Sequence, residues 1–190
     1  MKIGVLALQG AFAEHEKVLE QLGAECIELR QARNLSEPYD ALVLPGGEST
    51  VQGKLLKELG MFDIMKSQIE NGMPVLATCA GAILLAETID GQMKGQPEQY
   101  FGTIPMCIKR NAYGRQLGSF HTEAPVAGIG TVPMTFIRAP YIASVEDGVE
   151  VLAVVEERIV GVKYKKQMAF SFHPELDPDV RIHKAFLEMI

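Results

Sequence analysis

The stretch that decides the fold is Pro74-Val-Leu-Ala-Thr-Cys-Ala-Gly-Ala-Ile-Leu-Leu-Ala86. Residues 74–78 form a short, mostly apolar run, which is typical of a strand buried on both faces of a parallel sheet. Residues 82–86 continue as an apolar helical segment, with Cys79-Ala-Gly81 between the two. Small residues suit a sharp turn from strand to helix, because the backbone is crowded there. The stretch therefore predicts a strand, a tight turn that carries a cysteine, and a helix.

The flanking segments repeat this alternation of strand and helix. Apolar runs predict strands at 2–8, 25–29 and 40–44. Helical spacing predicts helices from 11 to 22, from Ser49 or Thr50 to about 59, and from about 61 to 71. After residue 91 the chain is rich in strand-forming segments, at 103–110, 131–137, 151–155, 158–164 and 168–172, and a packed helix closes it. We therefore expect an α/β three-layer sandwich with a mostly parallel central sheet.

The composition is that of an ordinary globular protein. With 47% hydrophobic residues among 190, the chain can bury one sizeable core, and we expect a single domain over 1–190. A net charge of −6 without a basic run argues against a nucleic-acid partner, and no span approaches the about 20 apolar residues of a membrane helix. Cys26, Cys79 and Cys107 lack the spacing of a zinc site or a disulfide framework, which favours the cytoplasm and no metal site.

Cys79 is the candidate nucleophile. It sits where a buried strand turns into a helix, so the positive end of the helix dipole favours its thiolate. The backbone N–H of Ala80 is left free to face an oxyanion. The alternative is that Cys79 is a small core residue, which is the usual fate of a free cysteine. Cys26 and Cys107 have no comparable context, and we interpret both as structural.

The segment Phe170-Ser-Phe-His-Pro-Glu175 supplies a candidate base. Residues two apart at the end of a strand project to the same side, which would let the Glu175 carboxylate reach the His173 ring. Such a pair fixes the tautomer of the imidazole and stabilises the imidazolium. Taken alone, the segment also fits a loop histidine beside a solvated acid. The other histidines, at 15, 121 and 183, are interpreted as structural or surface residues.

A glycine-rich turn, Pro45-Gly-Gly-Glu-Ser-Thr50, follows another predicted strand and opens a helix. Its glycines allow a backbone N–H to turn toward a substrate carbonyl, so Gly47 and Ala80 are the predicted donors of an oxyanion hole. A turn of this kind also cradles phosphates in other proteins. This one lacks both G-x-G-x-x-G and the Lys-Ser/Thr pair of a P-loop, which argues against phosphate binding.

Together, the segments 45–50, 78–81 and 171–176 resemble those of the class I (triad) glutamine amidotransferases, whose sandwich is flavodoxin-like. Within that superfamily, the chain is most similar to the glutaminase subunits of pyridoxal 5′-phosphate synthases. The similarity extends over the whole chain and includes residues 3–10, 110–116 and 136–140. It implies hydrolysis of L-glutamine by a triad of Cys79, His173 and Glu175.

The resemblance also implies the substrate-binding residues, which are Gly47, Glu48, Ser49, Arg110, Ile137 and Arg138. Arginines beside the site would suit the α-carboxylate of glutamine, although each alone also fits a surface salt bridge. No cofactor is implied. The chain departs from the family pattern at Val51-Gln-Gly53, where Thr-Met is more usual, and we expect this change to be silent.

The implied partner is a TIM-barrel synthase subunit that takes up the ammonia, within a large hetero-oligomer. We expect the isolated chain to be a poor glutaminase, because the peptide between Gly46 and Gly47 can flip and disable the oxyanion hole. The turn 9–12 is the expected docking surface. Three alternatives stay open: a cysteine peptidase or deglycase of related fold, a γ-glutamyl hydrolase, and a non-catalytic scaffolding module.

Overall fold

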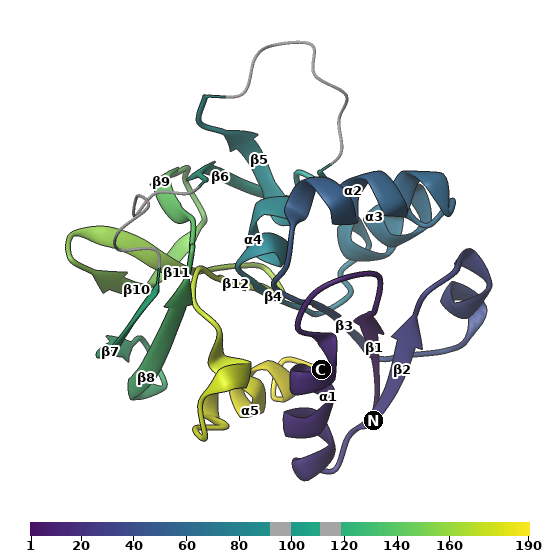
Figure 1. Ribbon diagram of the computed structural model, residues 1–190, viewed down its shortest axis with the longest axis horizontal. Coiled ribbons are helices and arrows are strands. Elements are labelled where there is room, and N and C mark those ends of the chain that lie inside the picture. The colour runs from purple at the N-terminus through teal and green to yellow at the C-terminus, as the bar shows by residue number, and fades with distance from the viewer. Residues whose placement is uncertain (92–99, 111–118) are drawn as a thin grey trace.

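The computed structural model describes residues 1–91, 100–110 and 119–190, and its elements alternate as the sequence predicts (Figure 1). The helices are α1 (Phe12–Gln21), α2 (Ser49–Glu58), α3 (Phe62–Glu70), α4 (Ala80–Leu85) and α5 (Arg181–Leu187). The first strands are β1 (Lys2–Leu6), β2 (Glu25–Leu29), β3 (Ala41–Leu44), β4 (Val75–Thr78), β5 (Ala86–Ile89) and β6 (Ile104–Lys109). The later strands are β7 (Ser119–Val126), β8 (Gly130–Ile137), β9 (Tyr141–Val145), β10 (Glu150–Val155), β11 (Arg158–Tyr164) and β12 (Gln167–Phe170).

A ten-stranded sheet runs through the molecule in the order β2-β1-β3-β4-β12-β11-β9-β6-β5, and β10 pairs with β11. The first five strands in this order, β2-β1-β3-β4-β12, are all parallel, and their order is that of the flavodoxin-like doubly wound fold. In β3 and β4, every residue is buried because helices cover both faces of this part of the sheet. Beyond β12 the strands turn antiparallel, apart from the pair β5–β6.

Helices lie on both sides of the sheet and make the two outer layers of the sandwich. Helices α2, α3 and α4 are on one side, and α1 and α5 are on the other (Figure 1). Each side has its own apolar core: Leu56, Met65 and Leu84 belong to one buried cluster, and Leu19 and Phe186 belong to the other. The predicted α/β three-layer sandwich with a mostly parallel sheet is therefore confirmed.

Three strands lie outside the sequence prediction. β7 pairs with β8 in a separate antiparallel hairpin. Its first half, residues 119–123, is largely exposed, so β7 lacks the apolar run that marks a buried strand. β9 was missed, and Ala86, expected to end a helix, instead begins β5. Most of the segment 110–116 lies outside the described residues. Within the described residues, no helix is long and apolar enough to cross a membrane.

Candidate active site

Four loops meet at one edge of the sheet, because they follow neighbouring parallel strands. Residues 9–11 come after β1, residues 45–48 after β3, Cys79 after β4, and residues 171–173 after β12. These strands are adjacent in the sheet, so their carboxyl ends lie side by side. In open α/β sheets, ligands bind at this edge. The sequence prediction that Cys79 and His173 come from strand ends at the same edge is confirmed.

Cys79 occupies a strained turn between β4 and α4. Its φ is +47°, a backbone conformation that residues other than glycine rarely adopt. Its N–H donates to the Phe170 carbonyl at 2.8 Å. The turn is crowded: a Cβ on Gly81 would stand 2.0 Å from the Leu44 carbonyl oxygen. Only glycine fits at that position, so the small residues have the predicted role. Ala80 begins α4, where the first N–H groups have no intrahelical acceptor.

His173 and Glu175 form the predicted pair. Nδ1 of His173 lies 2.6 Å from Oε1 of Glu175, and both side chains are buried. The pair forms differently from expected, since β12 ends at Phe170 and Glu175 sits in the 3-10 helix η2 (Pro174–Leu176) rather than two residues along a strand. The N–H of His173 donates to the Thr135 carbonyl at 2.8 Å, which fixes the backbone behind the ring.

The electrostatics of this pair favour a charged imidazole. Burial lowers the pKa of His173, but hydrogen bonds with Cys79 and Glu175 raise it more, to about 10. Burial raises the pKa of Glu175, while the charges of His15 and His173 and the hydrogen bond with His173 lower it below its ordinary value. The arrangement therefore favours an imidazolium between the Cys79 sulfur and the Glu175 carboxylate.

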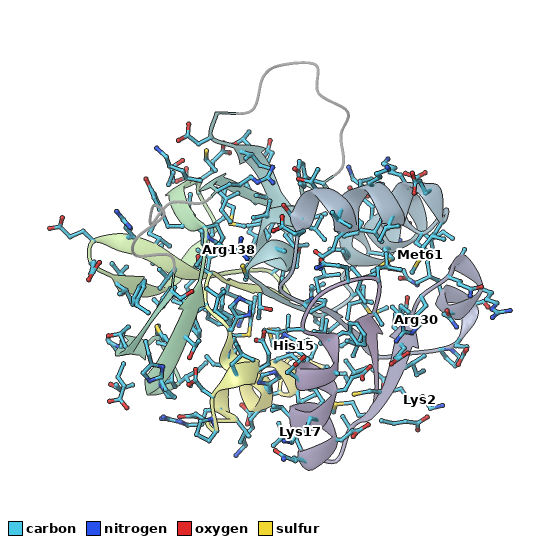
Figure 2. All side chains as sticks on the ribbon, in the orientation of Figure 1. Lys2, His15, Lys17, Arg30, Met61 and Arg138 are labelled. Carbon is cyan, nitrogen blue, oxygen red and sulfur yellow. The ribbon has the colours of Figure 1, made fainter. Side chains whose placement is uncertain are left out.

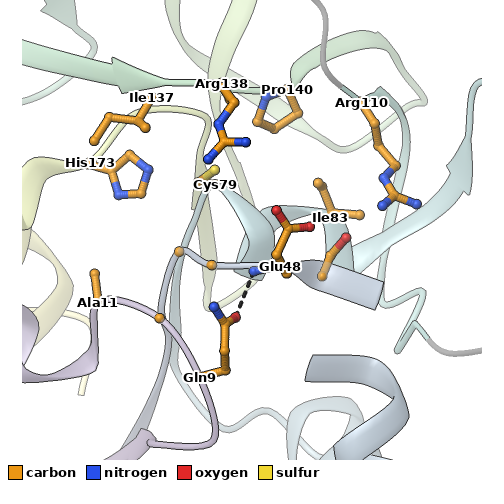
Figure 3. A pocket seen from close by; sticks show the side chains of 14 residues that line it. Gln9, Ala11, Glu48, Cys79, Ile83, Arg110, Ile137, Arg138, Pro140 and His173 are labelled. Carbon is orange, nitrogen blue, oxygen red and sulfur yellow. Dashed lines mark hydrogen bonds between the residues drawn. The ribbon is translucent and has the colours of Figure 1, made fainter. Parts of the chain in front are cut away.

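The glycine loop is tied to the turn that follows β1. The Gly46 carbonyl accepts the Ala11 N–H at 3.1 Å, and the Gly46 N–H donates to the Thr78 hydroxyl at 3.1 Å. Oε1 of Gln9 accepts the Glu48 N–H at 2.7 Å (Figure 3). In a planar trans peptide the N–H and the C=O point in opposite directions. The Gly47 N–H therefore points away from the side on which the Gly46 carbonyl accepts the Ala11 N–H.

A pocket of about 430 Å³ opens above these loops (Figure 3). Cys79 and His173 line it, as do all six predicted substrate-binding residues: Gly47, Glu48, Ser49, Arg110, Ile137 and Arg138. Glu175 and Ala80 do not line the pocket: Glu175 contacts the His173 ring, and Ala80 directly follows Cys79 in the chain. The structure therefore brings together every residue that the sequence put in the site. Its volume is in the range of sites for small molecules.

The two arginines lie beside the pocket without being buried. Arg138 is exposed and has a φ of +43°, and Figure 3 shows its guanidinium beside Cys79. Arg110 is half-buried and donates to the Thr50 hydroxyl at 2.8 Å and to the Tyr100 hydroxyl at 3.3 Å. With Glu48 also lining the pocket, groups of both signs surround the space next to the thiol.

Sequence reasoning missed several residues that support the site. Gln52, expected to be a silent departure, is fully buried and donates from Nε2 to the Gln9 carbonyl at 2.9 Å and to the Pro45 carbonyl at 3.2 Å. His15 and His183, interpreted as structural or surface residues, are fully buried near Glu175. Only contacts between distant segments reveal these roles, and a single sequence carries no signal for them.

Comparison with known proteins assigns the chain to a family. A model of the SNO glutamine amidotransferase family matches residues 5–190. The chain belongs to the SNO glutamine amidotransferase family. A family relative from Desulfitobacterium hafniense, named pyridoxal 5′-phosphate synthase subunit PdxT, is 58% identical over 100% of this chain and 94% of its own length. The protein of that name from Streptococcus pneumoniae is 53% identical over 100% of this chain and 97% of its own length.

Solved structures of this kind share the architecture. One described as a crystal structure of glutamine amidotransferase matches with a TM-score of 0.92 and 44% identity, over 98% of this chain and 97% of that chain. PurLQS from Thermotoga maritima matches with a TM-score of 0.73 at 15% identity, over 98% of this chain and 97% of that chain, which supports the fold alone. The resemblance to glutamine amidotransferases that the three motifs predicted is thus confirmed for this SNO family member.

Proposed function

We propose that residues 1–190 form one glutaminase domain that hydrolyses L-glutamine to L-glutamate and ammonia for the synthesis of pyridoxal 5′-phosphate. The observation that carries the proposal is the convergence of Cys79, on its strained turn, with the buried pair of His173 and Glu175 at the floor of a polar pocket. A relative 58% identical over the whole chain bears the name of a pyridoxal 5′-phosphate synthase subunit.

In the proposed reaction, the Cys79 thiolate attacks the carbon of the glutamine side-chain amide. The negative charge moves to the amide oxygen, where the N–H groups of Gly47 and Ala80 stabilise it. The carbon–nitrogen bond then breaks while His173 gives its proton to the departing ammonia, which leaves a γ-glutamyl thioester on Cys79. His173 next takes a proton from water, the resulting hydroxide cleaves the thioester, and the thiolate is restored.

The charges around the pocket suit the zwitterionic end of glutamine. We assign its α-carboxylate to the guanidinium groups of Arg110 and Arg138, because planar guanidinium groups bind carboxylates with two hydrogen bonds. Glu48 has the opposite charge and suits the α-ammonium group, while Ile137 and Ser49 flank the substrate. The amide end would then reach the sulfur in a pocket of about 430 Å³, which is ample for one amino acid.

The ammonia passes, in this proposal, to a TIM-barrel synthase subunit in a large cytoplasmic hetero-oligomer. The hydrogen bond from Ala11 to the Gly46 carbonyl links the turn after β1 to the peptide that carries the Gly47 donor. A partner that binds at this turn can therefore set the orientation of that peptide. One oxyanion donor is worth about 10²–10³ in rate, which is enough to keep the isolated chain nearly inactive.

The test is the release of glutamate from saturating glutamine, measured with and without a pyridoxal 5′-phosphate synthase subunit. We expect hydrolysis that rises when the synthase is added and that is absent in Cys79→Ala. A diazoketone analogue of glutamine should label the wild type at Cys79 and leave the variant unlabelled. Release of glutamate from poly-γ-glutamate in preference to glutamine would instead identify a γ-glutamyl hydrolase, and failure to label would support a scaffolding role.

A further inference from the structure

A chain of buried polar groups continues behind the pocket, past Glu175. Nε2 of His15 lies 3.3 Å from Oε2 of Glu175, and Nδ1 of the same ring lies 2.9 Å from Nε2 of His183. His15 comes from α1 and His183 from α5, and Figure 2 shows His15 between its own helix and the C-terminal segment. Both histidines are fully buried, and neither has a part in the reaction described above.

The contacts select one arrangement of protons in this chain. If His15 carries its proton on Nε2, it can donate toward Glu175, and its Nδ1 accepts the Nε2 proton of His183. In this arrangement Nδ1 of His183 carries no proton and needs no acceptor. This agrees with the described part of the chain, where the atom has no hydrogen-bond partner. The opposite tautomers would bury an unpaired N–H on His183 and turn a lone pair of His15 toward a carboxylate, and both are costly.

The second oxygen of Glu175 needs such a donor. Within residues 1–91, 100–110 and 119–190, Oε2 makes no well-aligned hydrogen bond, although it is fully buried. Nε2 of His15 is 3.3 Å away from Oε2 and also lies 3.1 Å from the Thr78 hydroxyl, so both oxygens are within its reach. Catalytic hydrogen bonds are often long before substrate binds and tighten as charge develops.

We propose that His15, held in one tautomer by His183, is a positioning residue that donates from Nε2 to Oε2 of Glu175 and so fixes the carboxylate that orients His173. This proposal rests on the proposed glutaminase function. Oε1 faces His173 at 2.6 Å, so a second anchor on Oε2 prevents the carboxylate from rotating away from the ring. The position also connects α1, which begins directly after the turn 9–11 of the pocket, to the catalytic base.

The charges around His15 agree with this role. Burial lowers the pKa of His15 and so favours the neutral ring, in which Nε2 remains a donor, while the Glu175 carboxylate raises that pKa and opposes the shift. The titratable groups that act on it are Glu14 on its own helix, His173 and Glu175 on the loop after β12, and His183 on α5. An N–H donor at Oε2 stabilises the charged carboxylate, so His15 lowers the pKa of Glu175 and removing His15 raises it.

The test compares His15→Leu with His15→Gln, in the presence of the synthase subunit. Gln can place an N–H near the position of Nε2, whereas Leu cannot. We expect kcat for glutamine to fall about 10–100-fold in the Leu variant, less than the about 10⁴-fold for losing the charge of a triad acid, with KM nearly unchanged. In the Leu variant, the acid limb of the pH profile should move to higher pH. The Gln variant should regain most of the wild-type kcat and most of the wild-type pH profile.

Leu19→Ala is the matched control, because Leu19 is a fully buried residue of the same helix that belongs to the apolar core. It should lower the melting temperature without moving the pH profile. A His15→Leu variant whose kcat and pH profile match those of Leu19→Ala would overturn the proposal, as would equal losses in the Leu and Gln variants.

If His15→Leu does not fold, the His183→Leu variant tests the proposal instead. It removes the donor to Nδ1 of His15, so it should shift the acid limb in the same direction, and an unchanged profile would overturn the proposal. Wild-type protein that releases no glutamate would refute the proposed function instead, so the two failures are distinct.

Discussion

The substitution Gly46→Ala tests whether the glycine loop confines His173, the proposed base. A Cβ at this position would stand 2.3 Å from Cε1 of His173 and 3.0 Å from Nδ1. Ordinary contact begins near 3.4 Å, so the ring and the loop must separate by about 1.1 Å. The backbone of Gly46 needs no positive φ, and the substitution therefore acts through this contact alone.

A displacement of this size breaks the geometry of the base. His173 has a hydrogen bond of 2.6 Å to Glu175 on one side and the thiol on the other, and it cannot move by an ångström and keep both. Misplacement by about 1 Å costs on the order of 10²-fold in rate. We therefore expect kcat for glutamine hydrolysis to fall about 100-fold in Gly46→Ala, measured as glutamate release in the presence of the synthase subunit.

Gly72→Ala is the control for effects on stability. Gly72 follows α3 with a φ of +93°, and a Cβ added there would meet no atom within 4 Å, so alanine strains the backbone far from the site without a clash. It should lower the melting temperature and leave kcat unchanged. A folded Gly46→Ala protein with kcat within about threefold of the wild type would refute the reasoning, since the ring would then have room to move.

The site supports four further predictions. Cys79→Ala should keep the fold and lower the rate of glutamine hydrolysis on the order of 10⁶-fold. In the same glutamate assay, Glu175→Gln should reduce the rate less than His173→Ala does, because the amide oxygen still accepts the ring N–H. His173 should stabilise the fold fully below pH 6.5 and progressively less as pH rises to about 10, since folding raises its pKa; unfolding of wild type and His173→Gln against pH checks this. Gln52→Leu should release the Gln9 and Pro45 carbonyls and lower kcat and stability together, whereas equal activity would show the link to be dispensable.

The sequence predicted the parallel half of the sheet because its strands are continuous apolar runs. β3 and β4 are buried over their whole lengths, and so their residues carry no alternation that could mislead. β7 and β9 were missed for the opposite reason: exposed positions interrupt both strands, and β9 pairs with β6, a separate segment of the chain. Local pattern alone does not indicate such strands.

The same division applies to the site. The segments around Cys79, Gly47 and His173 each carry a local mark, a small-residue turn or a His-Pro-Glu sequence, and were found for that reason. His15 and His183 occupy helical positions that resemble ordinary core positions, and 168 residues separate the two rings that touch. Their relation to Glu175 arises from the packing of α1 against the loop after β12, which no spacing in the sequence encodes.

The sheet brings the proposed nucleophile and the proposed base to the same edge. Phe170 pairs with Thr78 in the register of β4 and β12, and the N–H of Cys79 donates to the Phe170 carbonyl at 2.8 Å. The two adjacent strands therefore place Cys79 and the loop that carries His173 at the same edge of the sheet. The predicted oxyanion loop at 45–47 is held by hydrogen bonds to three elements. The Ala11 N–H donates to the Gly46 carbonyl, Nε2 of Gln52 donates to the Pro45 carbonyl, and the Gly46 N–H donates to the Thr78 hydroxyl at the end of β4. In the proposed mechanism, attack and proton transfer therefore depend on residues at the ends of β4 and β12. Stabilisation of the oxyanion depends on a loop that is also tied to the turn after β1, and through this turn we propose that a docked partner controls the rate without disturbing the proposed triad.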